Sequence, residues 1–244
     1  MPCYNPIKGW LKKGGGFTTS LSDGYKNIPQ QIPCNQCIGC RQEKRRQWAV
    51  RLIHESQCHE ESAFLTLTYD EENLPLCKSI CPRHTQLFIK RLRKFLEPVK
   101  ISYFVAGEYG DDFNGDYRKK YGGNLGRPHY HLILFGYWPK DSTDWPSDTP
   151  YKLWTSDKLS RIWKKGRVIL GQVTYDTASY TAKYCTKKIT GNPAEKLYEG
   201  KLPEFARMSK RPAIGLTWYR QYWKETLRDG YIVVDNKKMQ PPLY

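Results

Sequence analysis

The segment PHYHLILF, residues 128–135, gives the clearest indication of how the chain folds. Side chains alternate between the two faces of a strand, so His129 and His131 project from one face and Tyr130 projects from the other. The apolar run at 132–135 has the length of a strand in a protein core. Two imidazoles on one face can chelate a single divalent ion. The segment therefore predicts a core strand that supplies two ligands of a metal site.

A third ligand is expected from the preceding strand, which is predicted at residues 101–109 and has Glu108 at its end. The polar, Gly-rich residues 110–127 are interpreted as a hairpin loop, which would place the carboxylate beside His129 and His131. Two imidazoles and one carboxylate leave coordination positions open for a phosphate oxygen. Mg²⁺ or Mn²⁺ suits phosphate chemistry, and the imidazoles favour Mn²⁺. The alternative is two incidental histidines on a half-exposed strand.

The rest of the sequence predicts further strands and helices, and with them the fold class. Hairpin-joined strands in the middle of the chain indicate an α+β fold, in which a central antiparallel sheet with flanking helices is preceded by a Cys-rich N-terminal arm. Residues 1–33 are rich in Gly, Pro, Ser and Thr and are expected to be irregular. Strands are predicted at 64–69, 129–137, 167–175 and 231–234, and helices at 41–60, 82–97, 153–163, 177–189 and 217–227.

The charge balance indicates a polyanionic partner. The 244 residues include 40 Lys and Arg against 24 Asp and Glu, which gives a formal net charge of +16 and a sequence pI near 9.4. The chain also has 8 Trp, 18 Tyr and 8 Phe, and aromatic faces stack on unpaired bases while basic side chains hold phosphates. This combination favours single-stranded nucleic acid over an acidic membrane. A basic surface kept for solubility is the alternative.

A second candidate for chemistry is the predicted helix at 177–189. Tyr180 and Tyr184 share one helix face, and each is followed three residues later by a lysine, Lys183 or Lys187. A phenol with a pKa near ~10 attacks poorly at neutral pH, and a nearby cation favours the phenolate. Attack by such a tyrosine on a phosphodiester would free a 3′-hydroxyl and leave a 5′-phosphotyrosine link. The alternative is a core aromatic pair beside a solvated basic face.

The eight cysteines are interpreted as metal ligands or buried thiols. No apolar run approaches the roughly 18 residues that span a bilayer and no signal peptide is evident, so we expect a cytoplasmic protein, where disulfides are rare. Cys34, Cys37 and Cys40 form a Cys-x-x-Cys-x-x-Cys motif that suits a structural Zn²⁺, with Cys3 as the natural fourth ligand. An iron–sulfur cluster has less support, and unligated thiols are the alternative. Other candidates for the fourth ligand are Cys58, His54 and His59.

Taken together, these motifs resemble those of replication initiators in the His-hydrophobe-His endonuclease superfamily. The resemblance is closest to the initiators of microviruses, the small single-stranded DNA phages, and in particular to the gokushovirus branch. The order and spacing of the motifs make the resemblance specific, and they are spread over residues 3 to about 190. The matching segments are PCNQCIGCR (33–41), QWAVR (47–51), 64–69, GEYG (107–110), GRPHYH (126–131) and 180–188.

The resemblance implies a metal-dependent endonuclease that starts rolling-circle replication. It implies that His129 and His131 bind the metal, with Glu108 as the third ligand. It further implies that Tyr184 is the nucleophile and Tyr180 its partner. In such initiators the two tyrosines alternate, so that the plus-strand origin is nicked and the strand is later rejoined. Host polymerase and helicase would extend the free end in the host bacterial cytoplasm.

The resemblance also divides the chain into three parts. These are an arm with the Cys cluster and a basic helix at 1–60, an endonuclease core at 61–195 and a basic, aromatic C-terminal extension at 196–244. The strand at 64–69 would help to bind DNA, and the extension could bind DNA or pack on the sheet. No Walker-type Gly-x-x-x-x-Gly-Lys-Ser/Thr segment is present, so no fused helicase is inferred.

Two other functions fit parts of the sequence. A basic, zinc-containing protein that coats single-stranded DNA would need the charge and the aromatics but neither the tyrosines nor the histidines. A metal-dependent hydrolase of small phosphoesters would use His129, His131 and Glu108, but it leaves the basic charge and the tandem Tyr-x-x-Lys pattern unexplained. Metal-dependent covalent attachment to DNA distinguishes the nickase from both.

Overall fold

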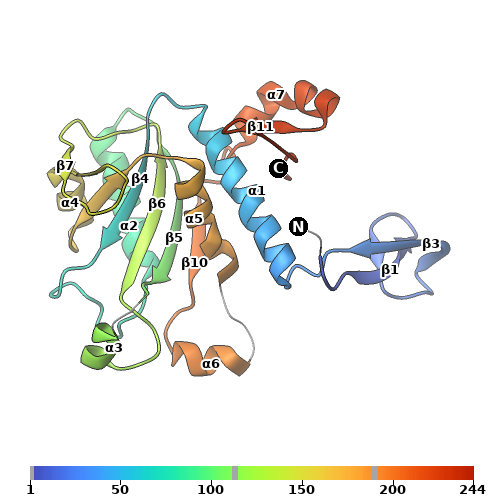
Figure 1. Ribbon diagram of the computed structural model, residues 1–244, viewed down its shortest axis with the longest axis horizontal. Helices are drawn as coiled ribbons and strands as arrows, with labels where there is room; N and C mark the ends of the chain where they lie inside the picture. Colours follow the sequence, from blue (N-terminus) through green and yellow to red (C-terminus); the bar gives the residue numbers. More distant parts are fainter. Residues whose placement is uncertain (1–2, 112–114, 188–191) are drawn as a thin grey trace. The chain divides into compact units, whose positions relative to one another are not determined.

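Figure 1 shows a computed structural model of the chain, which describes residues 3–111, 115–187 and 192–244. The chain divides into two compact units, Met1–Arg46 and Gln47–Tyr244. The first unit carries a small sheet and the start of helix α1 (Ile38–Ser56), and the second carries the central sheet of the protein.

The N-terminal unit contains a three-stranded antiparallel sheet in the order β2-β1-β3. We expected residues 1–33 to be irregular, and for most of this segment the expectation is wrong. Gly14, Gly15 and Gly16 have φ of 89°, 98° and 89°, a conformation that glycine adopts at little cost in a tight turn. The glycine run therefore closes the hairpin between β1 and β2 instead of breaking the structure. The strands are β1 (Ile7–Lys12), β2 (Phe17–Thr18) and β3 (Gly24–Ile32).

The larger unit is built on a seven-stranded antiparallel sheet flanked by helices, which confirms the predicted α+β fold. The strand order is β10-β5-β6-β4-β9-β8-β7, so that β6, which carries the two histidines, lies inside the sheet between β5 and β4. Strand β10 pairs antiparallel with β5 at one edge. The strands are β4 (Ser62–Thr68), β5 (Ser102–Tyr109), β6 (Pro128–Phe135), β7 (Thr143–Trp145), β8 (Leu153–Thr155), β9 (Val168–Gly171) and β10 (Phe205–Met208).

The two faces of this sheet pack against different helices, and Figure 1 shows α2 and α5 on opposite sides. On one face, Tyr130 packs with Trp163 in a core formed with α2 and α4. On the other face, Ile133 packs in a second core formed with α5 and the later part of α1. By the same alternation, His129 and His131 project from this second face. These helices are α2 (Pro82–Leu96), α4 (Asp157–Trp163) and α5 (Tyr175–Lys187).

Residues 153–163 were predicted as one helix, but they form strand β8 followed by the shorter helix α4. Strand β8 pairs with both β7 and β9, and α4 begins only after Ser156. The Ser156 hydroxyl accepts a hydrogen bond of 3.1 Å from the Leu159 backbone N–H and so caps the helix. Backbone pairing in the sheet outweighs the helical spacing of the apolar residues in this segment.

Shorter helices occupy parts of the chain for which no helix was predicted. The predicted loop at 110–127 contains α3 (Asp116–Tyr121). Helix α6 (Asn192–Tyr198) follows the described part of α5 in the chain.

Helix α5 itself was predicted at 177–189. It is described as far as residue 187, so the last two residues of the predicted helix lie outside the described residues.

The C-terminal segment contributes to the core of the larger unit. Besides β10 at the sheet edge, it buries Ile214, Ile232 and Val234 in the core that includes α5. Its elements are α7 (Leu216–Asp229), β11 (Ile232–Val234) and β12 (Lys237–Met239), the last two forming a hairpin. No helix in the described ranges is both long and apolar enough to cross a membrane.

Replacing Trp163 with alanine should destabilise the larger unit by about 3–5 kcal/mol. The Trp163 side chain is fully buried, packs edge-on against Phe88 at 5.9 Å, and donates to the Thr68 carbonyl over 2.8 Å. The substitution leaves both a cavity and an unpaired carbonyl. Urea unfolding followed by circular dichroism measures the loss. The control is Trp223→Ala, at a side chain that is 42% exposed, which should change stability by less than about 0.5 kcal/mol; equal losses would contradict the assignment of the core.

Candidate active site

Glu108 and His129 stand directly opposite each other on the paired strands β5 and β6. The pairing extends to the base of the loop, where the Gly110 N–H donates to the Arg127 carbonyl over 2.9 Å. A Cβ atom at Gly126 would lie 1.9 Å from the Gly110 carbonyl oxygen, so only glycine allows this close approach. The loop is long, but it closes tightly at its base and keeps the carboxylate in register with the imidazole.

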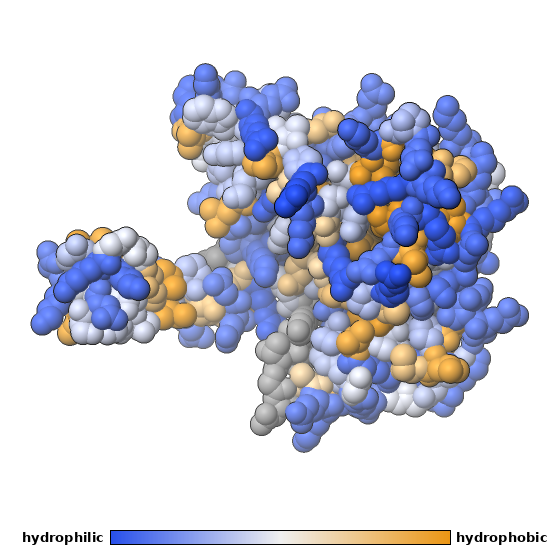
Figure 2. Space-filling model, turned by 180° about the vertical axis from the view of Figure 1, so that it is seen from behind, coloured by the Kyte–Doolittle hydropathy of each residue, from blue (hydrophilic) through white to orange (hydrophobic). Residues whose placement is uncertain are grey.

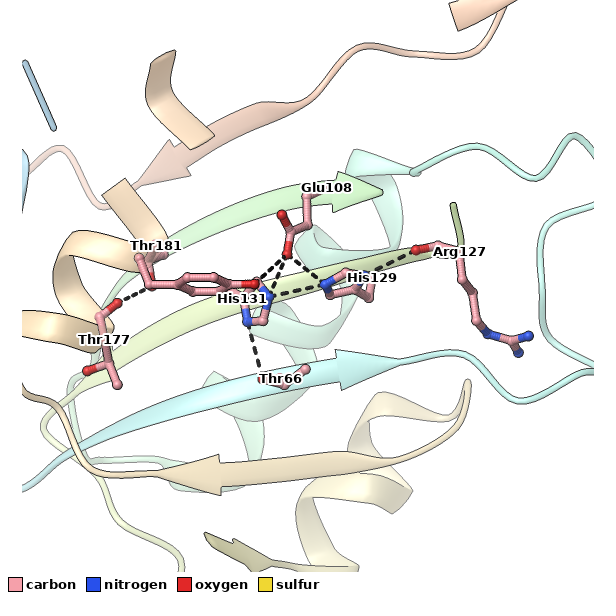
Figure 3. A network of polar contacts seen from close by, with 8 residues as sticks. Thr66, Glu108, Arg127, His129, His131, Thr177 and Thr181 are labelled. Carbon is pink, nitrogen blue, oxygen red and sulfur yellow. Dashed lines mark hydrogen bonds and ion pairs between the residues drawn. The ribbon is translucent and has the colours of Figure 1, made fainter. Parts of the chain in front are cut away.

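The three residues predicted as metal ligands converge on one point, as Figure 3 shows. The Nε2 atoms of His129 and His131 each lie 2.7 Å from Glu108 Oε1 and 3.1 Å from each other. Glu108 and His131 are buried, whereas His129 is partly exposed. The structure therefore brings together the side chains that strand alternation and the hairpin reading had predicted to meet.

Each imidazole is oriented through its other ring nitrogen (Figure 3). His129 Nδ1 donates to the Arg127 carbonyl over 3.1 Å, and His131 Nδ1 lies 3.2 Å from the Thr66 hydroxyl. With Nδ1 engaged, Nε2 of each ring stays available as a ligand. Sequence reasoning assigned no individual role to Thr66. The signal for it is its place directly opposite His131 on β4, which becomes visible once β4 and β6 are known to pair.

The geometry and charge of the three side chains suit a divalent metal ion. Separations of 2.7–3.1 Å are close to the roughly 3 Å between adjacent ligands on an ion with bonds of about 2.0–2.1 Å. As long as no ion is bound, burial raises the pKa of Glu108, but hydrogen bonds and charge from His129 and His131 lower it by more, which keeps the carboxylate ionised and ready to accept a cation in place of the imidazole protons. Burial also lowers the pKa of His131 and so favours the neutral imidazole that binds metals.

Helix α5 places both predicted tyrosines against these three side chains. The Tyr180 hydroxyl donates to Glu108 Oε1 over 3.2 Å, and its ring packs edge-on against His131 with centroids 4.9 Å apart. The Tyr184 ring stacks on His131 at 5.9 Å, and the two tyrosine rings lie 5.4 Å apart. Tyr180 is 40% exposed and Tyr184 is 3% exposed, so a substrate in solvent can reach the first hydroxyl more easily.

The surroundings of the tyrosines oppose the phenolate as long as no cation is bound. Burial raises the pKa of Tyr180 to about 12, and the Glu108 carboxylate adds to this effect. Burial and the same carboxylate raise the pKa of Tyr184 still further. A metal ion held by Glu108 would reverse the sign of the local charge and would then favour the phenolate of a neighbouring tyrosine.

A family of proteins described as replication-associated protein ORF2/G2P matches residues 62–189, a segment that contains the two histidines, Glu108 and both tyrosines. The chain belongs to this family. The match covers more than half of the sequence and begins at the first residue of β4.

Three phage proteins of this kind are similar over almost the whole chain. Replication-associated protein VP4 of Bdellovibrio phage phiMH2K is 33% identical over 99% of this chain and 74% of its own length. Replication-associated protein ORF2 of Spiroplasma virus 4 is 34% identical over 98% and 76%. Replication-associated protein ORF4 of Chlamydia phage 1 is 30% identical over 96% and 58%. These relatives confirm the resemblance to microvirus replication proteins, and no solved structure matches.

The two lysines of the Tyr-x-x-Lys pattern have fewer described contacts with the Glu-His-His group than the two tyrosines have. Lys183 is exposed on α5, and within the described part of the chain no hydrogen bond or ion pair joins it to Glu108 or the histidines. The side chain of Lys187 lies outside the described residues. The structure therefore brings the tyrosines to the candidate metal centre but does not bring Lys183 there.

The four cysteines predicted as zinc ligands lie together in the N-terminal unit, where their sulfur atoms are all within 4.8 Å of one another. Cys3 is the fourth member of this group. The alternatives for that position make other contacts in the larger unit: His54 stacks on Trp218, Cys58 donates to the His54 carbonyl, and His59 pairs with Glu55.

Proposed function

We propose that this protein starts rolling-circle replication by nicking single-stranded DNA at the phage origin through a tyrosine, and that it later rejoins the strand. The observation that carries the proposal is the meeting of two tyrosines with a Glu-His-His group: the Tyr180 hydroxyl and both imidazole Nε2 atoms point to the same oxygen of Glu108. The family and its phage relatives, all named replication-associated proteins, support a role in initiation.

In this proposal Glu108, His129 and His131 hold Mg²⁺ or Mn²⁺, with the imidazoles favouring Mn²⁺. When bound, the ion would polarise the scissile phosphate and favour the phenolate. The protein contributes orientation: Thr66 and the Arg127 carbonyl fix the two rings, and the buried carboxylate holds the Tyr180 hydroxyl beside the ligand atoms.

The proposed reaction transfers a phosphodiester from the DNA strand to tyrosine. The phenol gives up its proton and its oxygen forms a bond to phosphorus while the bond from phosphorus to the 3′-oxygen breaks, and that 3′-oxygen takes up a proton to become a 3′-hydroxyl. The product is a 5′-phosphotyrosine link, and because its energy is conserved, a 3′-hydroxyl can attack the link and restore the strand. With Tyr180 and Tyr184 as alternating nucleophiles, one tyrosine would hold the strand while the other makes the next cut.

The surroundings of the site fit a polyanionic substrate. The chain carries a net charge of +16, and Figure 2 shows that hydrophilic residues cover most of the visible surface. Lys183, exposed on the helix of the tyrosines, and Lys187 are proposed to hold the DNA backbone. Host helicase and polymerase would then act on the freed 3′-end, and the protein would work in the host bacterial cytoplasm, with no role at a membrane.

A cleavage assay on single-stranded DNA that carries the phage origin tests the proposal. The protein is incubated with Mn²⁺ or with EDTA, and the products are separated on a denaturing gel. We expect a protein–DNA adduct with Mn²⁺ and none with EDTA. Tight binding of the verified origin strand without an adduct, with either Mg²⁺ or Mn²⁺, would instead identify a non-catalytic, zinc-containing protein that coats single-stranded DNA.

A further inference from the structure

The N-terminal unit has almost no hydrophobic core. Among its described residues, the buried ones are Gly9, Gly24, Gly39 and Cys40, so no large apolar side chain is enclosed. Its apolar residues are half-buried or exposed, and Figure 2 shows hydrophobic patches on the surface of this unit. The exposed ones include Ile7, Leu21, Ile28 and Ile38, which are 39–61% exposed. A unit of this size needs a disulfide, a metal or a partner to stay folded.

The four cysteines are placed where a cross-link would hold this unit together. Cys3 precedes β1, Cys34 follows β3, and Cys37 and Cys40 stand at the start of α1. The sulfur–sulfur distances are 3.5 Å for Cys3 and Cys34, 3.9 Å for Cys34 and Cys40, and 3.9 Å for Cys37 and Cys3. Four sulfurs around one zinc ion, with bonds of about 2.3 Å, lie about 3.8 Å apart.

The backbone around the cluster is arranged to stabilise thiolates. The Tyr4 N–H donates to Cys37 Sγ over 3.4 Å, the Cys34 N–H to Cys3 Sγ over 3.3 Å, and the Cys37 N–H to Cys34 Sγ over 3.4 Å. Such hydrogen bonds offset the negative charge that four thiolates place on one ion. These sulfur–sulfur distances suit four ligands of a single ion. They are too short for cysteine sulfurs that each bind a different iron of an iron–sulfur cluster.

We propose that Cys3, Cys34, Cys37 and Cys40 bind one structural zinc ion, separate from the metal of the Glu-His-His group, and that the N-terminal unit folds only around it. Four protein sulfurs leave no open position, which is typical of a structural site and not of a catalytic one. Because the unit lacks an apolar core, metal binding supplies the free energy that folds it.

Elemental analysis of the full chain, purified without added metal and dialysed against EDTA, should find one zinc per chain. Limited proteolysis should leave residues 1–46 intact in this protein and degrade them in Cys34→Ser, which should contain less than a tenth of the zinc. Cys77→Ser, at an exposed cysteine outside the cluster, is the matched control and should keep both properties. A protein without zinc whose N-terminal unit still resists protease overturns the proposal, as does one in which iron replaces zinc.

A separate observation concerns a hollow of about 340 Å³ beside the candidate active site. Thr66, which touches His131, lines it, and so does Thr177, which lies one helical turn before Tyr180. The apolar part of the lining comes from Phe64, Leu153 and the strand residues Ile169, Leu170 and Gly171. The other lining residues are Thr149, Tyr151, Lys152, Gln172 and Thr174. Tyr151 is 63% exposed, and Lys152, which also lines the hollow, follows it in the chain.

We infer, on the basis of the proposed function, that this hollow receives one unpaired base of the DNA strand next to the scissile phosphate. An apolar floor and an exposed aromatic ring suit the face of a base, and Lys152 suits the phosphate that accompanies it. The two threonines place the hollow next to both the candidate metal ligands and the tyrosine helix, so a base held there would position the neighbouring phosphate at the site.

Binding of origin strands that carry one abasic position each tests this inference independently of cleavage. Fluorescence anisotropy should show about tenfold weaker binding for one abasic position beside the nick. Gly171→Leu, which fills the hollow at a residue with room for a Cβ, should weaken binding of the intact strand tenfold and remove the sensitivity to that position. Gly171→Ala should behave nearly as the parent chain. Unchanged sensitivity in Gly171→Leu overturns the inference, whereas the cleavage assay alone decides the proposed function.

Discussion

Replacing both Tyr180 and Tyr184 with phenylalanine is expected to abolish the covalent protein–DNA adduct, a loss of at least ~10⁴-fold in cleavage rate. Phenylalanine keeps the packing of both rings on His131 and removes only the hydroxyls, so binding of the origin strand should stay within about threefold. The adduct is measured on denaturing gels with Mn²⁺ in excess. Tyr231→Phe, at a tyrosine that is 36% exposed elsewhere, serves as control. An undiminished adduct in the double variant would exclude both tyrosines as nucleophiles.

The single variants should differ, because the two hydroxyls differ in access. Tyr180 is 40% exposed, whereas Tyr184 is 3% exposed and stacks on His131. We therefore expect Tyr180→Phe to slow the first cut about 100-fold, which is the loss of a nucleophile whose role the second tyrosine can partly take over, and Tyr184→Phe to slow it less. Tyr184→Phe should mainly block the second transfer, which is measured by joining of a labelled second strand. Equal effects on both steps would show that the tyrosines exchange roles freely.

The meeting of the three candidate metal ligands was predictable because it follows from local rules. Alternation along one strand places His129 and His131 on the same face, and a hairpin is enough to bring Glu108 across from them. The length of the loop between these strands does not decide whether Glu108 lies opposite the histidines. What keeps the register is the base of the loop, where Gly126 allows two backbones to approach closely.

The features that sequence reasoning missed depend on contacts between distant segments. Strand β8 is set by pairing with β9, which outweighs its helical spacing, and the role of Thr66 requires that β4 lie beside β6. In the N-terminal unit, the composition of the glycine run predicts a break, because composition alone does not show that the strands on either side of it pair. A local residue pattern indicates which face of a strand is buried and where the chain turns. Which strands lie next to each other in the sheet depends on the whole chain.

Substituting Glu108 with glutamine should abolish metal-dependent cleavage, with a loss of at least ~10³-fold. The amide has the shape of the carboxylate but lacks its charge. The Nε2 atoms of both histidines therefore keep an oxygen or nitrogen atom beside them, while the negatively charged ligand is lost. Thermal unfolding measures the cause directly: Mn²⁺ at about 100 times its Kd should stabilise the parent chain by about 2.7 kcal/mol and the variant hardly at all. Glu72→Gln, at an exposed glutamate, should respond to Mn²⁺ as the parent does.

Thr66→Val distinguishes a metal site from a merely polar cluster, because valine removes the hydroxyl beside His131 Nδ1 and leaves all three ligand atoms in place. A partner that orients a ligand typically contributes 10- to 100-fold in metal affinity. We therefore expect Thr66→Val to need that much more Mn²⁺ for half-maximal cleavage and to regain nearly full activity when the ion is in excess, whereas Glu108→Gln stays inactive at any concentration. If Thr66→Val lost activity that no amount of Mn²⁺ restored, the threonine would act on the DNA strand and not through the metal.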